Sequence, residues 1–141
     1  MTEVAFHFNV PDKLAYGCRL LRKAWGSGAR VIVTAEPDTL ERLDLMLWTF
    51  SALEFVPHCR QSAPVATLAA SPVLLASTLA DCPHHEVLVN LGQGVPPGFE
   101  RFERFIELVT VADADRAAAR SRWKHYTDRG YAMKRHDLAS A

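Results

Sequence analysis

The chain has 141 residues, of which 49% are hydrophobic and 23% are charged, with 16 basic and 16 acidic side chains. This length suits one compact domain with a substantial core, and the composition excludes a disordered chain, a collagen-like repeat and a coiled-coil rod. The even charge balance excludes a globally basic nucleic-acid-binding protein. The three cysteines, Cys18, Cys59 and Cys82, form no close pair, which argues against a disulfide framework and favours a reducing cytosol.

No targeting or membrane segment is expected. Glu3 comes early, and no basic stretch precedes an apolar run, as a secretory signal would require. Residues 61–80 carry no charge, but Pro64 and Pro72 interrupt them and small polar residues dilute them, so they do not fit a membrane span. We therefore expect a soluble, cytoplasmic protein.

The first half of the chain predicts two strands and two helices. Residues 3–8 alternate with a period of two, which is typical of a strand. Apolar residues at helical spacing predict a helix over residues 11–26. The helix is expected to end at the glycines there, because glycine readily adopts the left-handed backbone conformation that often terminates helices. The β-branched run 30–34 predicts a strand covered on both faces. Residues 37–48 predict a second helix, and we expect a loop over 49–63.

The second half predicts three further strands and one helix. Residues 72–77 and 86–91 predict buried strands, and residues 105–109 predict the last strand. Asp113 is expected to cap a final helix that runs to about Arg129. Strands that alternate with helices in this way indicate βαβ units. We therefore expect one α/β domain over residues 1–141, a three-layer α/β/α fold with a mostly parallel, Rossmann-like sheet.

Neither glycine-rich segment fits a phosphate-binding loop. Gly26 and Gly28 follow a helix and precede a strand, whereas a phosphate loop needs the reverse order because the helix N-terminus supplies the anion-binding amides. Gly92 and Gly94 follow a strand, but the Val-Pro-Pro run behind them prevents a helix start. No G-x-x-x-x-G-K-[ST] motif occurs. The sequence therefore predicts a sheet without a phosphate-binding loop and no cofactor.

Nothing in the sequence argues for catalysis. Cys82, His84 and His85 are clustered, but zinc sites usually have paired ligands on both sides, and this cluster is one irregular half. Asp81 and a neighbouring histidine could be two parts of a triad, yet no serine is placed to complete it and no G-x-S-x-G motif occurs. We therefore expect no metal site and no enzyme.

The C-terminal part of the chain is strongly basic. Residues 116–135 contain seven basic residues and one acidic residue, a net charge of +6. A spacing of four places three of them on one helical face: Arg116, Arg120 and Lys124. Trp123 lies next to this face, so the stripe suits an acidic, partly apolar peptide terminus or single-stranded nucleic acid. The alternative is a solvated helix whose Trp123 and Tyr126 pack on the sheet.

A second feature is the concentration of large apolar residues after the second helix. Trp48, Phe50, Leu53 and Phe55 fall within eight residues of an expected surface loop. Loops seldom hold so many large apolar residues unless they present a binding patch or wrap the core, and aromatic residues often anchor protein interfaces. Both interpretations remain open.

Several short segments recur in the order and spacing of a known family. They are Phe6-His7-Phe8, Gly28-Ala29-Arg30-Val31, Leu43-Asp44, Leu47-Trp48, Phe55-Val56-Pro57-His58, Val87-Leu88-Val89-Asn90-Leu91, Ala119-Arg120-Ser121-Arg122-Trp123-Lys124-His125-Tyr126 and Arg129-Gly130-Tyr131. From Phe6 to Tyr131, the chain resembles the chi subunits of bacterial DNA polymerase III holoenzyme. The family often has tyrosine at the position of Trp123.

The resemblance implies a non-catalytic adaptor in DNA replication. Such proteins pair with the small psi subunit, which ties them to the clamp loader, and bind the acidic, hydrophobic C-terminal tail of single-stranded-DNA-binding protein. The psi-facing aromatic residues fall on Trp48 and Phe55. The tail-binding residues fall on Val109, Arg120 and Trp123, with Lys124 beside them. The resemblance also implies a monomer or a 1:1 heterodimer that contacts DNA only indirectly.

Two other functions stay open on the sequence. The first is direct binding of single-stranded nucleic acid by the same basic stripe. The second is a small nucleotide-dependent enzyme, which the missing phosphate loop disfavours.

Overall fold

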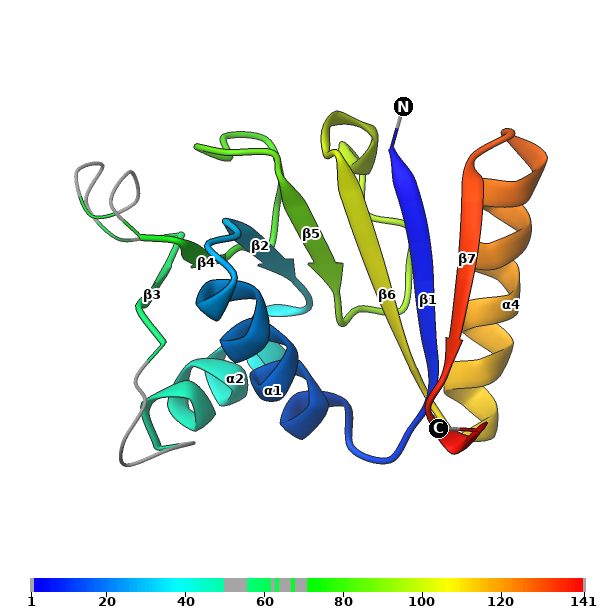
Figure 1. Cartoon of the computed structure of the whole chain (residues 1–141), viewed down its shortest axis with the longest axis horizontal. Coiled ribbons are helices and arrows are strands. Elements are labelled where there is room, and N and C mark those ends of the chain that lie inside the picture. Colours follow the sequence, from blue (N-terminus) through cyan, green and yellow to red (C-terminus); the bar gives the residue numbers. More distant parts are fainter. Residues whose placement is uncertain (1, 50–55, 62, 64–66, 68–70, 141) are drawn as a thin grey trace.

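The computed structural model describes residues 2–49, 56–61, 63, 67 and 71–140. Seven strands form one sheet in the order β3-β4-β2-β5-β6-β1-β7 (Figure 1). The strands are β1 (Glu3–Val10), β2 (Val31–Thr34), β3 (His58–Arg60), β4 (Val73–Leu75), β5 (Val87–Asn90), β6 (Arg104–Thr110) and β7 (Ala132–Asp137). The helices are α1 (Lys13–Gly26), α2 (Pro37–Thr49) and α4 (Asp113–Asp128), with short 3-10 turns η1 (Phe99–Arg101) and η2 (Leu138–Ser140). All pairings between these strands are parallel.

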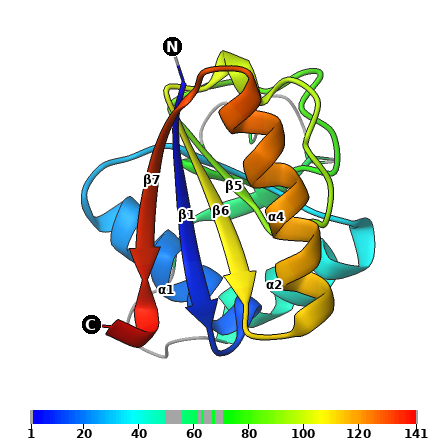
Figure 2. The ribbon, with the colours of Figure 1, turned by 90° about the vertical axis from the view of Figure 1, so that its right-hand side faces the viewer.

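Helices cover both faces of the sheet. α1 and α2 pack on one face, where Leu21 and Leu43 join a core with the strand residue Val33. α4 packs on the other face, where Tyr126 joins a core with Phe105 (Figure 2). Strands β2 and β5 lie between both cores and are buried along their length, as their continuous apolar runs predict. The expected three-layer α/β/α fold with a parallel, Rossmann-like sheet is confirmed.

The signals for α1 lie in the positions that the sequence indicates. Asp12 is the N-cap, and its carboxylate accepts a hydrogen bond of 3.1 Å from the backbone N–H of Ala15, which satisfies a helix-terminal donor. Gly28 follows the helix with a φ of 85°, a conformation that glycine adopts at little cost. Apolar burial and capping therefore act together to fix this helix.

Two strands were missed from the sequence. β3 lies inside the expected loop 49–63, and β7 follows residues 105–109, which the sequence wrongly makes the last strand. β3 has only three residues, too few to show a period. β7 is polar and mostly exposed at the sheet edge, so it lacks the alternation that a half-buried strand produces. Charged residues are common on such edges because they discourage pairing with other chains.

The predicted cap of the last long helix is also wrong. The N-cap of α4 is Ala112, with no side-chain hydrogen bond, and Asp113 is the first helical residue. The carboxylate of Asp115 instead accepts a hydrogen bond of 2.7 Å from the backbone N–H of Thr110, before the helix. An acidic residue in the first turn also interacts favourably with the positive end of the helix dipole.

None of the helices in the described part of the chain is long and apolar enough to span a bilayer.

Candidate functional site

A surface groove lies between α4 and the strands β1, β6 and β7. We call it the α4 groove; its cavity of about 470 Å³ is lined by Phe6, Phe8, Asn9, Val109, Arg116, Ala119, Arg120, Trp123 and Arg135. Four separate elements therefore supply its walls. In Figure 2, α4 runs alongside β6, β1 and β7, the three strands that supply the other lining residues of the groove.

The floor of the α4 groove is apolar. Phe6 and Trp123 meet edge to face, with ring centroids 5.1 Å apart, an arrangement favoured by the ring quadrupoles. Val109 is buried at the end of β6, whereas the indole of Trp123 is only partly buried. A flat or branched apolar group of a ligand can therefore contact Val109 and Trp123 together.

Among the described residues, the rim of the α4 groove carries three arginines and no acidic side chain. Arg116 donates a hydrogen bond of 2.7 Å from Nη2 to Oδ1 of Asn9. The guanidinium of Arg135 lies 5.0 Å from the ring centre of Phe8 and 5.9 Å from that of Trp123, within cation–π range. Arg120 is exposed and forms no ion pair or side-chain hydrogen bond with a described residue. The groove therefore combines an apolar floor with uncompensated positive charge.

The structure brings together three of the four residues that the resemblance assigns to a tail site. Val109, Arg120 and Trp123 line the groove, whereas Lys124 lies outside its lining. Lys124 Nζ forms an exposed ion pair of 2.8 Å with Asp128, one turn further along α4. The sequence missed Arg135 as a lining residue because β7 was not expected, and it missed Phe8 and Asn9 of β1 because nothing in the sequence places the end of that strand beside α4. The basic pair at positions 134–135 was the one feature of the sequence that could have indicated Arg135 as part of a basic binding surface.

One residue of the predicted basic stretch points inward. Arg122 is buried, and its Nε lies 3.0 Å from Oε2 of Glu107, which is also buried. Tyr126 donates a hydrogen bond of 2.6 Å to the same oxygen, and Asn90 donates one of 3.0 Å to Oε1. Burial raises the pKa of Glu107, while the charge of Arg122 and these hydrogen bonds act in the opposite direction. The network anchors α4 to β6, and Arg122 is not part of the surface stripe.

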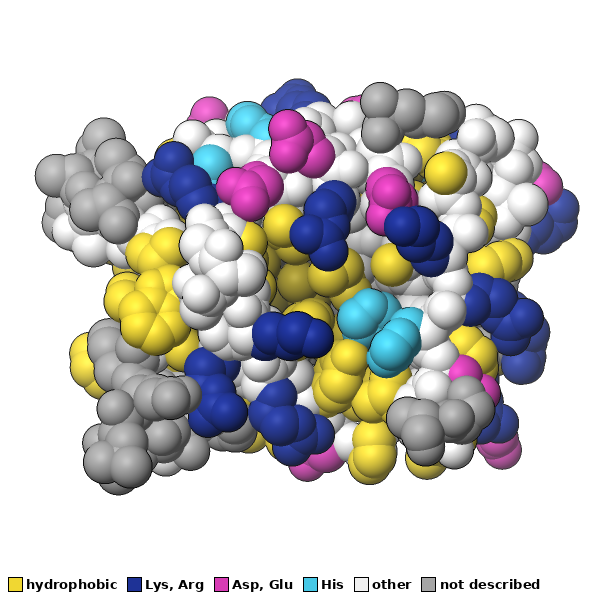
Figure 3. All heavy atoms as spheres, in the orientation of Figure 1, with side chains coloured by type: hydrophobic (Ala, Val, Ile, Leu, Met, Phe, Trp, Pro, Cys, Tyr) yellow, Lys and Arg dark blue, Asp and Glu magenta, His cyan; other side chains and the backbone are white. Residues whose placement is uncertain are grey.

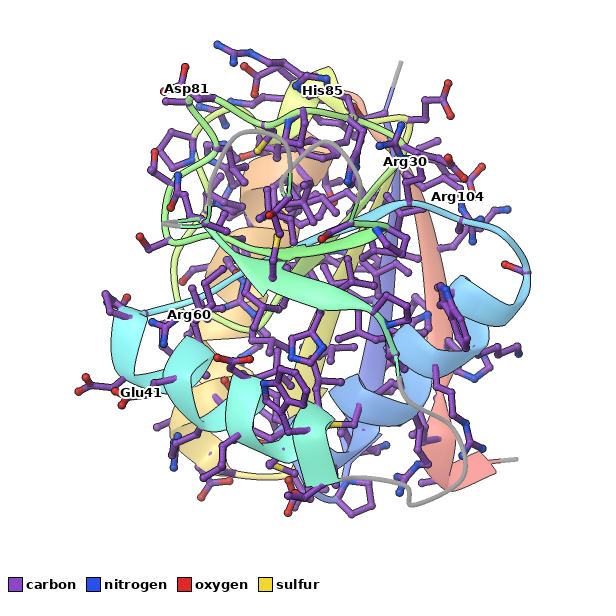
Figure 4. The ribbon with its side chains drawn as sticks, turned by 90° about the vertical axis from the view of Figure 1, so that its left-hand side faces the viewer. Arg30, Glu41, Arg60, Asp81, His85 and Arg104 are labelled. Atoms are coloured by element: carbon purple, nitrogen blue, oxygen red, sulfur yellow. The ribbon has the colours of Figure 1, made fainter. Side chains whose placement is uncertain are left out.

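A second candidate surface lies on α2. Trp48 is 61% exposed and Leu45 is 67% exposed, one helical turn apart; we call this pair the Trp48 patch. His58 packs edge to face against the indole, with centroids 5.5 Å apart, and donates a hydrogen bond of 2.8 Å from Nε2 to Asp44. The Trp48 patch borders a shallow cavity that is also lined by Arg60 of β3 and Glu41 of α2. Arg60 and Glu41 lie on one side of the molecule (Figure 4). Phe55, the other predicted residue, lies outside the described residues.

The Cys82–His85 cluster and the Gly92–Gly94 turn, the segments weighed for metal and phosphate binding, both lie in the described part of the chain. No group of three or more His, Cys, Asp or Glu side chains is placed to hold a metal ion in the part of the chain that the structure describes. His84 is buried, and burial lowers its pKa. At the Gly92–Gly94 turn, Asn90 accepts from the backbone N–H of Gly92 and donates to the carbonyl of Gly94, which is an ordinary Asx-type turn.

The fold and the groove define a parallel α/β protein with a surface groove that has an apolar floor and arginines at its rim. The family described as DNA polymerase III chi subunit, HolC, matches residues 1–134, and the chain belongs to this family. Membership gives the chain an accessory role in DNA replication, as a subunit of DNA polymerase III holoenzyme. The resemblance inferred from the sequence is confirmed.

Two relatives carry the name DNA polymerase III subunit chi. The protein of Pseudomonas aeruginosa is 33% identical over 144 residues, which cover 98% of each chain. The protein of Escherichia coli is 30% identical over 121 residues, which cover 81% of this chain and 78% of the relative. The C-terminal domain of the DEAD-box protein Dbp5 has a similar structure, with a TM-score of 0.58 and 13% identity over 99% of this chain and 91% of that one. This last likeness shows the fold alone.

Proposed function

We propose that the chain is a non-catalytic cytoplasmic adaptor that links the psi subunit and the clamp loader to single-stranded-DNA-binding protein. In this proposal the α4 groove receives the acidic, hydrophobic C-terminal tail of that protein, and DNA is contacted only through it. The observation that carries the proposal is the apolar floor of Val109 and Trp123 beneath an arginine rim without acidic residues.

The groove matches the chemistry of such a tail. A terminal phenylalanine ring would lie against Val109 and the indole of Trp123, and its carboxylate would accept hydrogen bonds from Arg120. Charge-assisted hydrogen bonds of this kind are short and directional, and each contributes roughly 1.5–3 kcal/mol when desolvated. Exposed ion pairs contribute only about 0.2–1 kcal/mol. Lys124 would add long-range attraction at the edge of the groove, so binding should be micromolar and sensitive to salt.

Calorimetric titration with a tail peptide ending in Asp-Pro-Phe tests this proposal. Arg120→Ala and Trp123→Ala should each weaken binding about tenfold or more, since tenfold corresponds to about 1.4 kcal/mol. Arg129→Ala is the matched control, because it removes the same charge next to the same helix but lies outside the groove. No binding by the unmodified protein at low salt would overturn the proposal, as would equal losses in all three variants.

Single-stranded nucleic acid is the competing ligand for the same groove. The partly exposed indole of Trp123 and the arginines of the rim resemble a stacking and backbone-binding surface. Titration with a bare oligonucleotide separates the two ligands. An adaptor binds the bare strand weakly and gains affinity when the strand is coated with single-stranded-DNA-binding protein. Tighter binding to the bare strand than to the tail peptide would contradict the adaptor.

We further propose that the Trp48 patch, with Phe55, docks the psi subunit. Two large apolar side chains one turn apart on an exposed helix face are suited to enter a partner's pocket. Co-purification with psi should be lost in Trp48→Ala. Trp25→Ala is the matched control, because Trp25 is 36% exposed on α1, away from the patch. Retention of psi by Trp48→Ala would exclude the patch as the contact.

A further inference from the structure

One part of the α1 side of the sheet is covered by none of the helices that the structure describes. On this side β1 presents Ala5 and His7, and β7 presents the exposed residues Lys134 and His136 directly opposite them. α1 packs over the neighbouring central strands instead (Figure 1). Because parallel sheets are normally covered on both faces, this edge is an unusual surface.

A cleft lies between α1 and this uncovered edge. We call it the α1 cleft; its volume is about 240 Å³. Its floor is aliphatic, formed by Leu20 and Leu21 of α1 and by Val87 and Ile106 of the sheet. Figure 3 shows an apolar hollow on this face, with lysine, arginine and histidine side chains around it and acidic side chains along its upper edge. A volume of about 240 Å³ is large enough for one apolar side chain.

The rim of the α1 cleft is cationic. Lys23 and Arg104 line it, and neither forms an ion pair or side-chain hydrogen bond with a described residue. Arg104 lies at the end of the sheet where the parallel strands begin (Figure 4). Glu3 is the one acidic residue among the described lining residues, and its carboxylate forms an ion pair of 2.9 Å with Lys134.

His7 lines the cleft and is affected both by burial and by the positive charges around it. Its pKa is lowered to about 4, first by burial and then by the charges of His136, Lys23 and Arg104. Its Nδ1 is hydrogen-bonded to the hydroxyl of Tyr16 at 2.7 Å. The imidazole is therefore neutral near pH 7, and an anion in the cleft would offset the neighbouring positive charges.

We infer that the α1 cleft binds an acidic peptide segment of a protein partner, with an aliphatic side chain on the floor and carboxylates at Lys23 and Arg104. The aliphatic floor favours a peptide over nucleic acid, because single-stranded nucleic acid is usually held by exposed aromatic rings. Within the described lining, the one ring besides that of His7 belongs to Phe105, which is fully buried in the opposite core. Since the cleft and the α4 groove lie on opposite faces, both can be occupied together.

The probe is a fluorescent peptide, Glu-Asp-Leu-Asp-Glu, blocked at both ends so that it lacks the terminal carboxylate proposed for the α4 groove. Fluorescence anisotropy should show binding that Lys23→Glu and Arg104→Glu each weaken about tenfold or more. Arg19→Glu is the matched control, because Arg19 is exposed on α1 outside the cleft, and it should change affinity less than about twofold. Thermal melts confirm that the variants fold.

A second readout locates the peptide. In NMR titrations, the saturating peptide should raise the pKa of His7, because the added carboxylates favour the protonated ring. Arg120→Ala should leave this shift unchanged, which separates failure of this inference from failure of the tail site. No binding, an unchanged pKa of His7, or preference for a deoxythymidine oligonucleotide over the peptide would each overturn the inference.

Discussion

At the scale of single residues, the Glu107–Arg122 pair distinguishes structural charge from surface charge on α4. Truncating one member of a buried pair leaves the other uncompensated, which typically costs about 3–5 kcal/mol. Arg122→Ala should therefore lower the free energy of unfolding in urea by that amount. Arg120→Ala removes an exposed arginine of the same helix and should change it by less than about 0.5 kcal/mol. Similar losses of unfolding free energy in Arg122→Ala and Arg120→Ala would contradict the assignment of Arg122 to the core and of Arg120 to the surface.

Asp115 ties the start of α4 to α1, and its titration should be visible in stability. Burial raises its pKa, but hydrogen bonds from the backbone of Thr110 and from Lys13 and Gln93 outweigh this and lower the pKa to about 2. The unfolded chain therefore binds more protons than the folded one between about pH 4 and pH 2, so stability falls as the pH drops through this range.

Asp115→Asn tests this linkage. The change should lower the free energy of unfolding at pH 7 by about 2.5 kcal/mol, because the pKa of Asp115 is lowered by almost two units and each unit corresponds to about 1.4 kcal/mol. It should also flatten the pH dependence below about pH 4. Urea unfolding curves at pH 7, 4 and 3 measure both effects. An unchanged slope below pH 4 in the variant would show that other carboxylates dominate acid unfolding.

The sequence could predict that residues 116–135 are basic, but not which of these residues are buried. Ala119, Arg122 and Tyr126 share the face of α4 that meets the sheet, a spacing that is clear only once the helix is placed. Glu107 lies in a strand expected from its apolar neighbours, and nothing local marks it as the partner of Arg122. Pairing between distant segments is therefore what the sequence could not supply.

At the scale of elements, β7 matters more for the groove than its polar sequence suggests. It pairs with β1 and carries Arg135 over Phe8 and Trp123. Arg135→Ala should weaken tail-peptide binding about threefold to tenfold, since a cation–π contact contributes about 0.5–1 kcal/mol and Arg135 also adds charge to the rim. Lys134→Ala, on the other face of the same strand, is the control in this titration. Equal losses of peptide affinity in Arg135→Ala and Lys134→Ala would indicate that the positive charge of β7 matters and that the contact of Arg135 with Phe8 and Trp123 does not.

The central elements were predictable because burial on both faces, helix caps and turn glycines leave local signals. β2, β5, α1 and α2 follow such signals within one or two residues. β3 and β7 were not predictable because they lie at the two edges of the sheet, where pairing with one neighbour replaces apolar burial. The α4 groove could therefore be predicted only in part, because one of its walls is the edge strand β7.

At the scale of the whole molecule, the α4 groove and the Trp48 patch lie on opposite faces of one rigid sheet. They share no lining residue, and independent sites usually show additive energies. Affinity for the tail peptide should therefore change less than about twofold when psi is bound. Titration of the peptide into the preformed complex with psi measures this. A larger change would mean that the two surfaces are coupled.

The most direct test of the adaptor compares three tail peptides: the free acid, its C-terminal amide, and a peptide with alanine in place of the terminal phenylalanine. The account predicts that the amide and the alanine peptide each bind about tenfold more weakly than the free acid. It also predicts that the difference between acid and amide disappears in Arg120→Ala, because that side chain holds the carboxylate. Equal binding of the acid and the amide to the unmodified protein would contradict the account.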